Sequence, residues 1–241
     1  MLDKAAFILE AFSPSGGPFR LSELSERTSL PKPTVHRLAA DLVRLGWLER
    51  SGPQYRLGAK LFELGSLVPH RLDLRETALP FLQDLFEATR ETVHLGVREG
   101  MEVVYLERIH GHEALRLPSR IGGSLPLSCT GVGKALLAFS GPELTEELLS
   151  RPLPSLTPYS ITDPARLRMA LEKIQVSGLA YEEQEAAAGV ACIAAPVFAG
   201  GGTTVAALSV AVPRSRFSPA QLAPAVRTAA LGLSRVLRAG T

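Results

Sequence analysis

Apolar residues recur at helical spacing between Pro31 and Gly46, and no other feature restricts the fold of the chain as strongly. The apolar face consists of Val35, Leu38, Leu42 and Leu45. Pro33 suits the first turn of such a helix, where its missing N–H is harmless. A shorter helical run begins at Leu21, and a turn at residues 28–31 separates the two helices. Two helices joined by so short a turn predict a helix-turn-helix unit.

Segments on either side complete this unit. A helix is expected around residues 5–12, where apolar residues again share one face and a run of Pro and Gly follows. Residues 47–50 and 55–57, separated by a turn at residues 51–54, predict a two-stranded ribbon. A ribbon that follows a helix-turn-helix predicts a winged helix-turn-helix over residues 1–58.

Positive charge is concentrated in this unit although the whole chain is nearly neutral. The 241 residues carry a formal net charge of +2, from 26 basic and 24 acidic side chains. Between Arg27 and Lys60, seven basic residues stand against two acidic ones, so this segment alone carries +5. Such a local excess predicts an anionic partner for this segment only.

The charge coincides with the elements that contact DNA in winged helix-turn-helix proteins. Polar side chains opposite the apolar face of the second helix, and those of the ribbon, are candidates for base and phosphate contacts. They are Lys32, Thr34, His36, Arg37, Arg44, Arg50, Tyr55 and Arg56. The alternative is a small helical domain that docks another protein. Within the DNA-binding hypothesis, His36 also fits a surface histidine, and Tyr55 also fits a residue that packs the ribbon onto Trp47.

Beyond residue 58, helices are followed by strands arranged in hairpins. The expected strands are residues 93–97, 103–106, 114–117, 193–198 and 205–212, and the expected helices are residues 72–90, 132–139, 163–176 and 218–237. Hairpins combined with packing helices predict an α+β domain over residues 72–241. Residues 59–71 are expected to form a linker helix between the two domains.

Cysteine content and hydropathy exclude several classes of protein. Cys129 and Cys192 lie far apart without CxxC spacing, so neither a disulfide framework nor a structural zinc site is indicated. The first residues lack the pattern of a signal peptide, and no segment approaches the roughly 18 apolar residues of a membrane helix. A cytoplasmic protein without a membrane partner is therefore expected.

Several motifs resemble one family along almost the whole chain. In the first domain they are residues 21–38 (LSELSERTSLPKPTVHRL), 45–50 (LGWLER) and 55–58 (YRLG). In the second domain they are residues 91–95 (ETVHL), 125–135 (LPLSCTGVGKA), 189–197 (GVACIAAPV) and 206–210 (AALSV). In order and spacing, these motifs resemble the IclR-type transcriptional regulators.

The resemblance implies a winged helix-turn-helix domain, a linker helix and a C-terminal effector domain of GAF-like α/β fold with an antiparallel sheet. It also implies a ligand-responsive, sequence-specific regulator, a repressor or dual regulator, that controls a catabolic or transport operon. Its partners would be a pseudo-palindromic double-stranded DNA operator and a small organic acid. The regulator would act as a homodimer or homotetramer, and no cofactor or metal is implied.

The family's effector pocket, carried over position by position, falls on Leu117, Leu125, Gly131, Val132, Glu182, Val190, Cys192 and Ser209. Gly131 and Val132 would offer backbone N–H groups at a helix start to an anion, and Glu182 stands where the family often has Asp. Ala211 replaces a Ser found in some members, and Ala114 stands where a larger apolar residue can occur. These departures imply a roomier, less polar pocket, so a hydroxylated aromatic or medium-sized aliphatic monoacid is expected ahead of a dicarboxylate.

Other chemistries fit the second domain less well. A P-loop is not favoured, because Ser128 stands where its first Gly is needed and Ala135 where it needs a hydroxyl after Lys. His110 and His112 are a weak metal pair, and a solvated loop is favoured. Cys129 lacks an inferable base, which favours a buried free thiol over a nucleophile. Residues 182–185 also fit a solvated acidic run.

Two alternative functions remain for the whole chain. They are a DNA binder whose second domain only oligomerises, and a small-molecule enzyme with a regulatory DNA-binding head.

Overall fold

The chain divides into two compact units, Met1–Leu72 and Asp73–Thr241. The computed structural model describes residues 1–13, 16–111, 115 and 117–239. Helices and strands occur in both units, and the second contains a six-stranded antiparallel sheet. The expected α+β class, with an N-terminal helix-turn-helix and a C-terminal domain built on an antiparallel sheet, is confirmed. The expected boundaries at residues 58 and 71 stay predictions.

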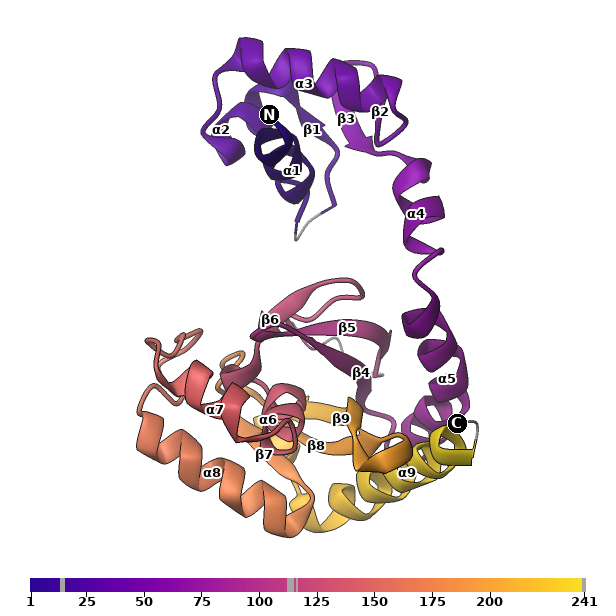
Figure 1. The fold of residues 1–241 in the computed structure, drawn as a ribbon, viewed down its shortest axis with the longest axis vertical. Helices are drawn as coiled ribbons and strands as arrows, with labels where there is room; N and C mark the ends of the chain where they lie inside the picture. The colour runs from indigo at the N-terminus through magenta and orange to yellow at the C-terminus, as the bar shows by residue number, and fades with distance from the viewer. Residues whose placement is uncertain (14–15, 112–114, 116, 240–241) are drawn as a thin grey trace. The chain divides into compact units, whose positions relative to one another are not determined.

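The first unit packs helices on a small antiparallel sheet (Figure 1). Its elements are α1 (Leu2–Glu10), β1 (Phe19–Arg20), α2 (Leu21–Thr28), α3 (Lys32–Arg44), β2 (Leu48–Ser51), β3 (Gln54–Leu57) and α4 (Ala59–Gly65). The strand order is β1-β3-β2, so the expected ribbon of β2 and β3 gains β1 on its outer edge.

Local chemistry fixes the turn between α2 and α3. Ser29 ends α2 in the left-handed backbone region, at φ 54°, and the hydroxyl of Ser25 donates a hydrogen bond to the Leu30 carbonyl at 2.6 Å. Pro31 occupies the N-cap position of α3, and Pro33 lies in the first turn of this helix. Both helices then bury apolar side chains in one core, made of Ile8, Phe12, Phe19, Leu24, Val35, Leu38, Ala39, Leu42, Leu48 and Tyr55.

The expected apolar face of α3 is confirmed except at its end. Val35, Leu38 and Leu42 are buried, whereas Leu45 is 49% exposed. The helix ends at Arg44, and Gly46 takes a positive φ of 74°, so the chain turns away before Leu45 reaches the core.

The second unit is built around the sheet, whose strand order is β6-β5-β4-β9-β8-β7. Its strands are β4 (Thr92–Glu99), β5 (Glu102–Ile109), β6 (Ser124–Pro126), β7 (Ala180–Glu183), β8 (Val190–Phe198) and β9 (Thr204–Pro213). Its helices are α5 (Pro69–Thr89), α6 (Gly131–Ala138), α7 (Pro142–Leu149), α8 (Pro164–Ser177) and α9 (Pro219–Ala239).

Helices cover both faces of this sheet (Figure 1). On one face, Leu82 of α5 and Leu233 of α9 are buried in one core with sheet residues such as Leu208 of β9. On the other face, α6 packs directly on the strands, and α8 packs on α6. The strand expected at residues 114–117 lies largely outside the described residues. Sequence patterns missed α7 and β7, and β7 turns out to be an edge strand that carries Glu182.

Candidate functional sites

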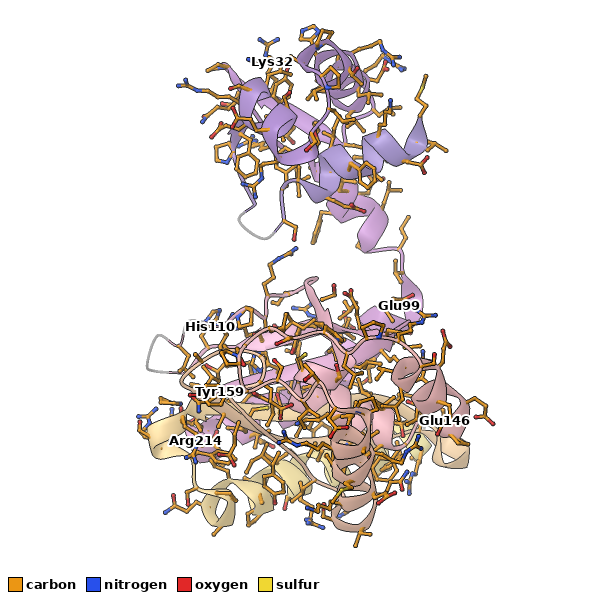
Figure 2. The ribbon with its side chains drawn as sticks, turned by 90° about the vertical axis from the view of Figure 1, so that its left-hand side faces the viewer. Lys32, Glu99, His110, Glu146, Tyr159 and Arg214 are labelled. Carbon is orange, nitrogen blue, oxygen red and sulfur yellow. The ribbon has the colours of Figure 1, made fainter. Side chains whose placement is uncertain are left out.

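The first candidate site is the solvent face of α3. Lys32, His36 and Arg37 are exposed and Thr34 is partly exposed, while the opposite face of the helix lies in the core. Figure 2 shows Lys32 at the surface of this unit. The helix thus presents donors and cations along one side, the arrangement that a DNA-reading helix needs. Arg44, in the last turn, is exposed and forms an ion pair with Asp41 at 3.3 Å.

The ribbon places two more arginines at the surface. Arg50 donates from Nε to the Gly52 carbonyl at 3.1 Å. Arg56 forms an ion pair with Glu49 at 2.7 Å, and the other oxygen of Glu49 accepts the Ala59 N–H at 3.2 Å. The hydrogen bond from Arg56, then that from Ala59, lowers the pKa of Glu49. One exposed carboxylate therefore joins both strands of the ribbon to the first residue of α4.

Tyr55 differs from the other expected DNA contacts. It is only 5% exposed and belongs to the core of the first unit. Its burial supports the packing alternative for this residue, and its contact with phosphate stays a prediction. The guanidinium of Arg50 lies 5.9 Å from the centre of the Tyr55 ring, so this ring also positions a surface cation.

The second candidate site is a cavity in the second unit, between the sheet and the start of α6. All the residues expected in the effector pocket line it: Leu117, Leu125, Gly131, Val132, Glu182, Val190, Cys192 and Ser209. Ala211 lines it too, whereas Ala114 lies outside the described residues. Sequence analysis missed other lining residues: His94, Tyr105, Pro118, Ser119, Thr130, Ala186 and Ala187.

Strand register explains why distant residues meet on the cavity floor. Glu182 pairs with Cys192, and Cys192 pairs with Ala211, so the three lie side by side across β7, β8 and β9. In the neighbouring row, Ser209 pairs with His94 on β4. Residues that face each other across antiparallel strands share one face of the sheet. The polar groups of the floor are therefore Glu182 and Cys192 in the first row and Ser209 and His94 in the second.

Two glycines allow α6 to approach the floor closely. A Cβ atom on Gly131 would lie 2.5 Å from the Cys192 sulfur, and one on Gly133 would lie 2.2 Å from the Leu127 carbonyl oxygen. The Thr130 side chain caps the helix by accepting the Gly133 N–H at 2.9 Å. A hydrogen bond from the Gly131 N–H acts to lower the pKa of the Cys192 thiol, against the larger effect of burial. In the described part of the chain, the Val132 N–H has no acceptor, and it is available to an anion.

His94 anchors a polar cluster beside the floor. Its Nε2 lies 2.8 Å from the Ser119 hydroxyl, and its Nδ1 lies 3.4 Å from the Ser209 hydroxyl. Arg108 donates to the Ser119 carbonyl at 2.5 Å. Burial, and then the charge of Arg108, lowers the pKa of His94 to about 3, so its imidazole is neutral. The sequence did contain a signal for a special role of His94, because it is a polar residue within the otherwise apolar strand expected at residues 93–97.

Glu182 is the acidic group of the cavity, and it is 3% exposed. Its Oε1 accepts the N–H groups of Glu185 at 2.5 Å and of Ala186 at 3.1 Å. Burial raises the pKa of Glu182 to about 7, although these hydrogen bonds and the nearby Lys134 ammonium oppose the rise. Burial likewise raises the pKa values of Cys192 and Tyr105. The cavity therefore carries little negative charge below neutral pH.

The cavity is narrow. It encloses about 390 Å³ of empty space with its mouth, but the centre of a water molecule can occupy only about 30 Å³. One water needs about 10–15 Å³ by that measure. A ligand the size of one aromatic ring must therefore fill the cavity and push its walls apart.

Other expectations concern metals, nucleophiles and membranes. Among the described residues, which exclude His112, no three His, Cys, Asp or Glu side chains gather as metal ligands. Cys129 is buried and donates to the Pro154 carbonyl at 3.2 Å, and burial raises the pKa of its thiol. Over the same part of the chain, no helix is long and apolar enough to cross a membrane.

Comparison with known proteins gives matches over both units. Residues 1–52 match the model of the IclR helix-turn-helix domain, and residues 67–235 match that of the bacterial transcriptional regulator IclR C-terminal domain. The HTH-type transcriptional regulator XynR of Escherichia coli K12 is 34% identical over 242 residues, which cover 98% of this chain and 96% of XynR. The regulator BhcR of Paracoccus denitrificans is 35% identical, covering 99% of this chain and 86% of BhcR.

A solved structure agrees with this result. The crystal structure of an IclR homologue from Microbacterium hydrocarbonoxydans, complexed with 4-hydroxybenzoate, superposes with a TM-score of 0.88. It is 35% identical in sequence, and the match covers 99% of each chain. The likeness therefore includes the helix-turn-helix, the linker and the sheet domain.

The neutral His94 predicts a specific pH dependence of stability. Because its pKa is about 3 when folded and about 6.5 when unfolded, the unfolded chain binds the extra proton between these values, and stability falls as the pH is lowered. Relative to His94→Gln, the parent should lose about 2 kcal/mol of unfolding free energy between pH 7.5 and 5. Urea unfolding at both values measures this difference, with the exposed His36→Gln as control. Equal losses for parent and His94→Gln would contradict a neutral buried imidazole.

Proposed function

The chain belongs to the IclR family of transcriptional regulators, and from this premise we propose how its two units divide the work. The helix-turn-helix unit binds a pseudo-palindromic operator in double-stranded DNA, with α3 in the major groove and the ribbon against phosphates. The second unit binds a small organic acid in the cavity under α6. The regulated genes are proposed to form a catabolic or transport operon, and the regulator to act on it in the cytoplasm.

The exposed row on α3 supports the DNA proposal. Lys32, Thr34, His36 and Arg37 lie on the solvent side of a helix whose other side is held by the core, so their backbone positions are fixed before DNA arrives. Arg50 and Arg56 extend the cationic surface onto the ribbon. Helix donors are suited to base edges, whereas ribbon arginines are suited to the phosphate backbone.

Exposed apolar side chains in the first unit support a homodimer or higher homo-oligomer. Leu2 is 84% exposed and Phe7 53% exposed on α1, and Phe62 is 83% exposed on α4. Leu2 and Phe7 belong to one helix and Phe62 to another, and large apolar side chains exposed in this way are candidates for a protein contact. A second copy of the chain is the proposed occupant, because two copies related by a two-fold axis match two operator half-sites.

The cavity supports a monoanionic, partly aromatic ligand. The Val132 N–H, which has no acceptor in the described part of the chain, favours a carboxylate at the start of α6. The walls contributed by Leu117, Leu125 and Val190 favour a hydrocarbon body. The homologue complexed with 4-hydroxybenzoate supports the same class of ligand for this chain. Ligand binding shifts the DNA-binding equilibrium if the cavity differs between the two states, since only differential affinity moves an equilibrium.

Two arginines should affect DNA binding differently. Arg37→Ala should cost about 1–3 kcal/mol on the operator and relax specificity at one position, because a base contact is lost. Arg56→Ala should weaken binding to all sequences alike and reduce the slope of log K against log salt by about 0.9. Electrophoretic mobility or fluorescence titrations at several salt concentrations measure both effects. Arg98→Ala, which removes an exposed arginine of the second unit, is the control, and parental binding by both test variants would refute the assignment.

The apolar surface of α4 should control assembly. Phe62→Glu should shift the protein towards monomers and weaken operator binding, because it places a charge in the proposed contact. Sedimentation velocity at DNA-binding concentrations measures the shift. Val176→Glu, at a residue that is 92% exposed on α8, is the matched control. An unchanged oligomer in Phe62→Glu, or a parent that is monomeric and protects one half-site, would contradict the model.

Substitutions at the cavity should alter ligand binding. Gly131→Val should abolish binding of 4-hydroxybenzoate, because even its Cβ would meet the Cys192 sulfur. Gly65→Val, where a side chain meets open space, is the control.

A second substitution should change the preference of the cavity for its ligand. Ala211→Ser should favour smaller, more polar acids, since a buried hydroxyl without a partner costs about 1–3 kcal/mol. Calorimetry with a panel of acids decides the point, and tight binding of a neutral or cationic compound that survives Gly131→Val would overturn the ligand class.

A further inference from the structure

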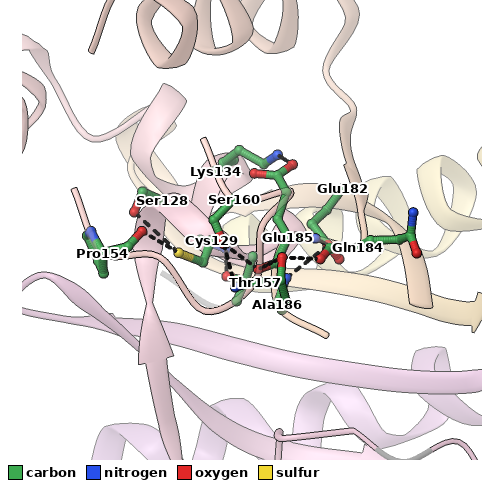
Figure 3. Close-up of polar contacts among 12 residues, drawn as sticks. Ser128, Cys129, Lys134, Pro154, Thr157, Ser160, Glu182, Gln184, Glu185 and Ala186 are labelled. Atoms are coloured by element: carbon green, nitrogen blue, oxygen red, sulfur yellow. Dashed lines mark hydrogen bonds and ion pairs between the residues drawn. The ribbon is translucent and has the colours of Figure 1, made fainter. Parts of the chain in front are cut away.

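The two carboxylate oxygens of Glu182 have unlike surroundings. Oε1 is saturated, because it accepts the backbone N–H groups of Glu185 and Ala186 (Figure 3). Oε2 receives no backbone N–H in the described part of the chain, and Glu182 lines the cavity beside the thiol of Cys192. An oxygen that meets no N–H donor is the one that best carries a proton.

The cation nearest to Glu182, Lys134, already has a carboxylate partner. The Lys134 ammonium, on α6, forms a buried ion pair and hydrogen bond with Glu185 (Figure 3). An ionised Glu182 would therefore leave two buried carboxylates beside one ammonium. A ligand carboxylate would add another negative charge at the same place, in a medium where unpaired charge is costly. A neutral Glu182 avoids both penalties.

The start of α6 lies against Glu182. A Cβ on Gly131 would be 3.5 Å from the Cβ of Glu182, so the helix start and the carboxyl group border the same small space. An anion that is bound by the Val132 N–H therefore lies within reach of the Glu182 side chain. Repulsion between two neighbouring carboxylates is removed if one proton is placed between them.

Resting on the proposed organic-acid function, we propose that Glu182 binds the effector as a neutral carboxylic acid, donating a hydrogen bond from Oε2 to the ligand carboxylate. When Glu182 is ionised in the free protein, one proton is taken up from solvent for each ligand bound. The effector response then depends on pH as well as on ligand concentration.

Several charged, titratable or polar groups face Glu182. They are Lys134 from α6, Glu185 and the Ala186 N–H from the following loop, Cys192 from β8 and Tyr105 from β5. Burial moves the pKa values of Cys192 and Tyr105 upward, and that of His94 is about 3. The pKa of Glu182, raised to about 7 by burial, falls inside the working range of a cell.

Calorimetry on the full-length protein tests the proposal, with benzoate and 4-hydroxybenzoate as probes. The affinity should fall about 30-fold between pH 6 and 8.5, because only the fraction with a protonated Glu182 binds. At pH 8, titrations in two buffers of different ionisation enthalpy should report uptake of close to one proton per site. Benzoate has no phenol group, so agreement between the two probes assigns the proton to the protein.

Glu182→Gln is the decisive variant. Its amide oxygen can accept the two backbone N–H groups while its amide nitrogen donates to the ligand, so binding should persist without pH dependence or proton uptake. Glu183→Gln changes the half-exposed neighbour that pairs with Arg214, and it should keep the parental pH dependence. Far-ultraviolet circular dichroism confirms that each variant is folded.

The outcomes separate this proposal from the function on which it rests. Parental binding that is independent of pH, or a Glu182→Gln variant that retains the pH dependence, overturns the neutral-acid proposal while leaving the ligand class intact. Absence of binding by every acid at pH 6 overturns the ligand class and the proposal with it, because no carboxylate is then recognised.

Discussion

The close approach of α6 to the sheet determines the geometry of the second unit. Gly131 and Gly133 have no side chains, so the helix start can lie against Cys192 and the Leu127 carbonyl. A larger residue at either position would push the helix away from the sheet, and α6 would then no longer cover the cavity. Helix donors, floor residues and Glu182 meet in one small space only because of this contact.

A buried ion pair holds the rim of the same space. Lys134 leaves α6 to meet Glu185, whose carbonyl also accepts the Ser160 hydroxyl at 2.8 Å. The ion pair ties the loop after β7 to α6, and the Ser160 hydrogen bond ties the same loop to the segment before α8. Removing one partner would leave an uncompensated buried charge, which costs far more than the pair itself contributes. The rim is therefore fixed, and the walls that can yield to a ligand are the apolar ones.

Periodicity predicted the helix-turn-helix and the main hairpins well, since apolar spacing reports directly which face is buried. It failed at β7, because four residues ending in Glu182 and Glu183 look like a solvated acidic run. Only pairing with β8 buries Glu182, and this contact is distant in sequence. Tyr55 and His94 show the same limit, since their residue types fit surface and core alike. The cavity residues were identified through family resemblance, and strand register explains why they meet.

The carboxylate of Glu49 couples the ribbon to the linker helix through a shared partner. In the free protein, one oxygen of this carboxylate forms an ion pair with Arg56, and the other accepts a hydrogen bond from the first N–H of α4. In the proposed DNA complex, a phosphate that binds Arg56 leaves this carboxylate to the helix start, where negative charge is favourable. Thermodynamic reciprocity then requires that any event that tightens or frays the first turn of α4 changes the availability of Arg56 by an equal free energy. In the proposed DNA complex, phosphate binding by Arg56 and the first turn of the linker helix are therefore linked through this one carboxylate.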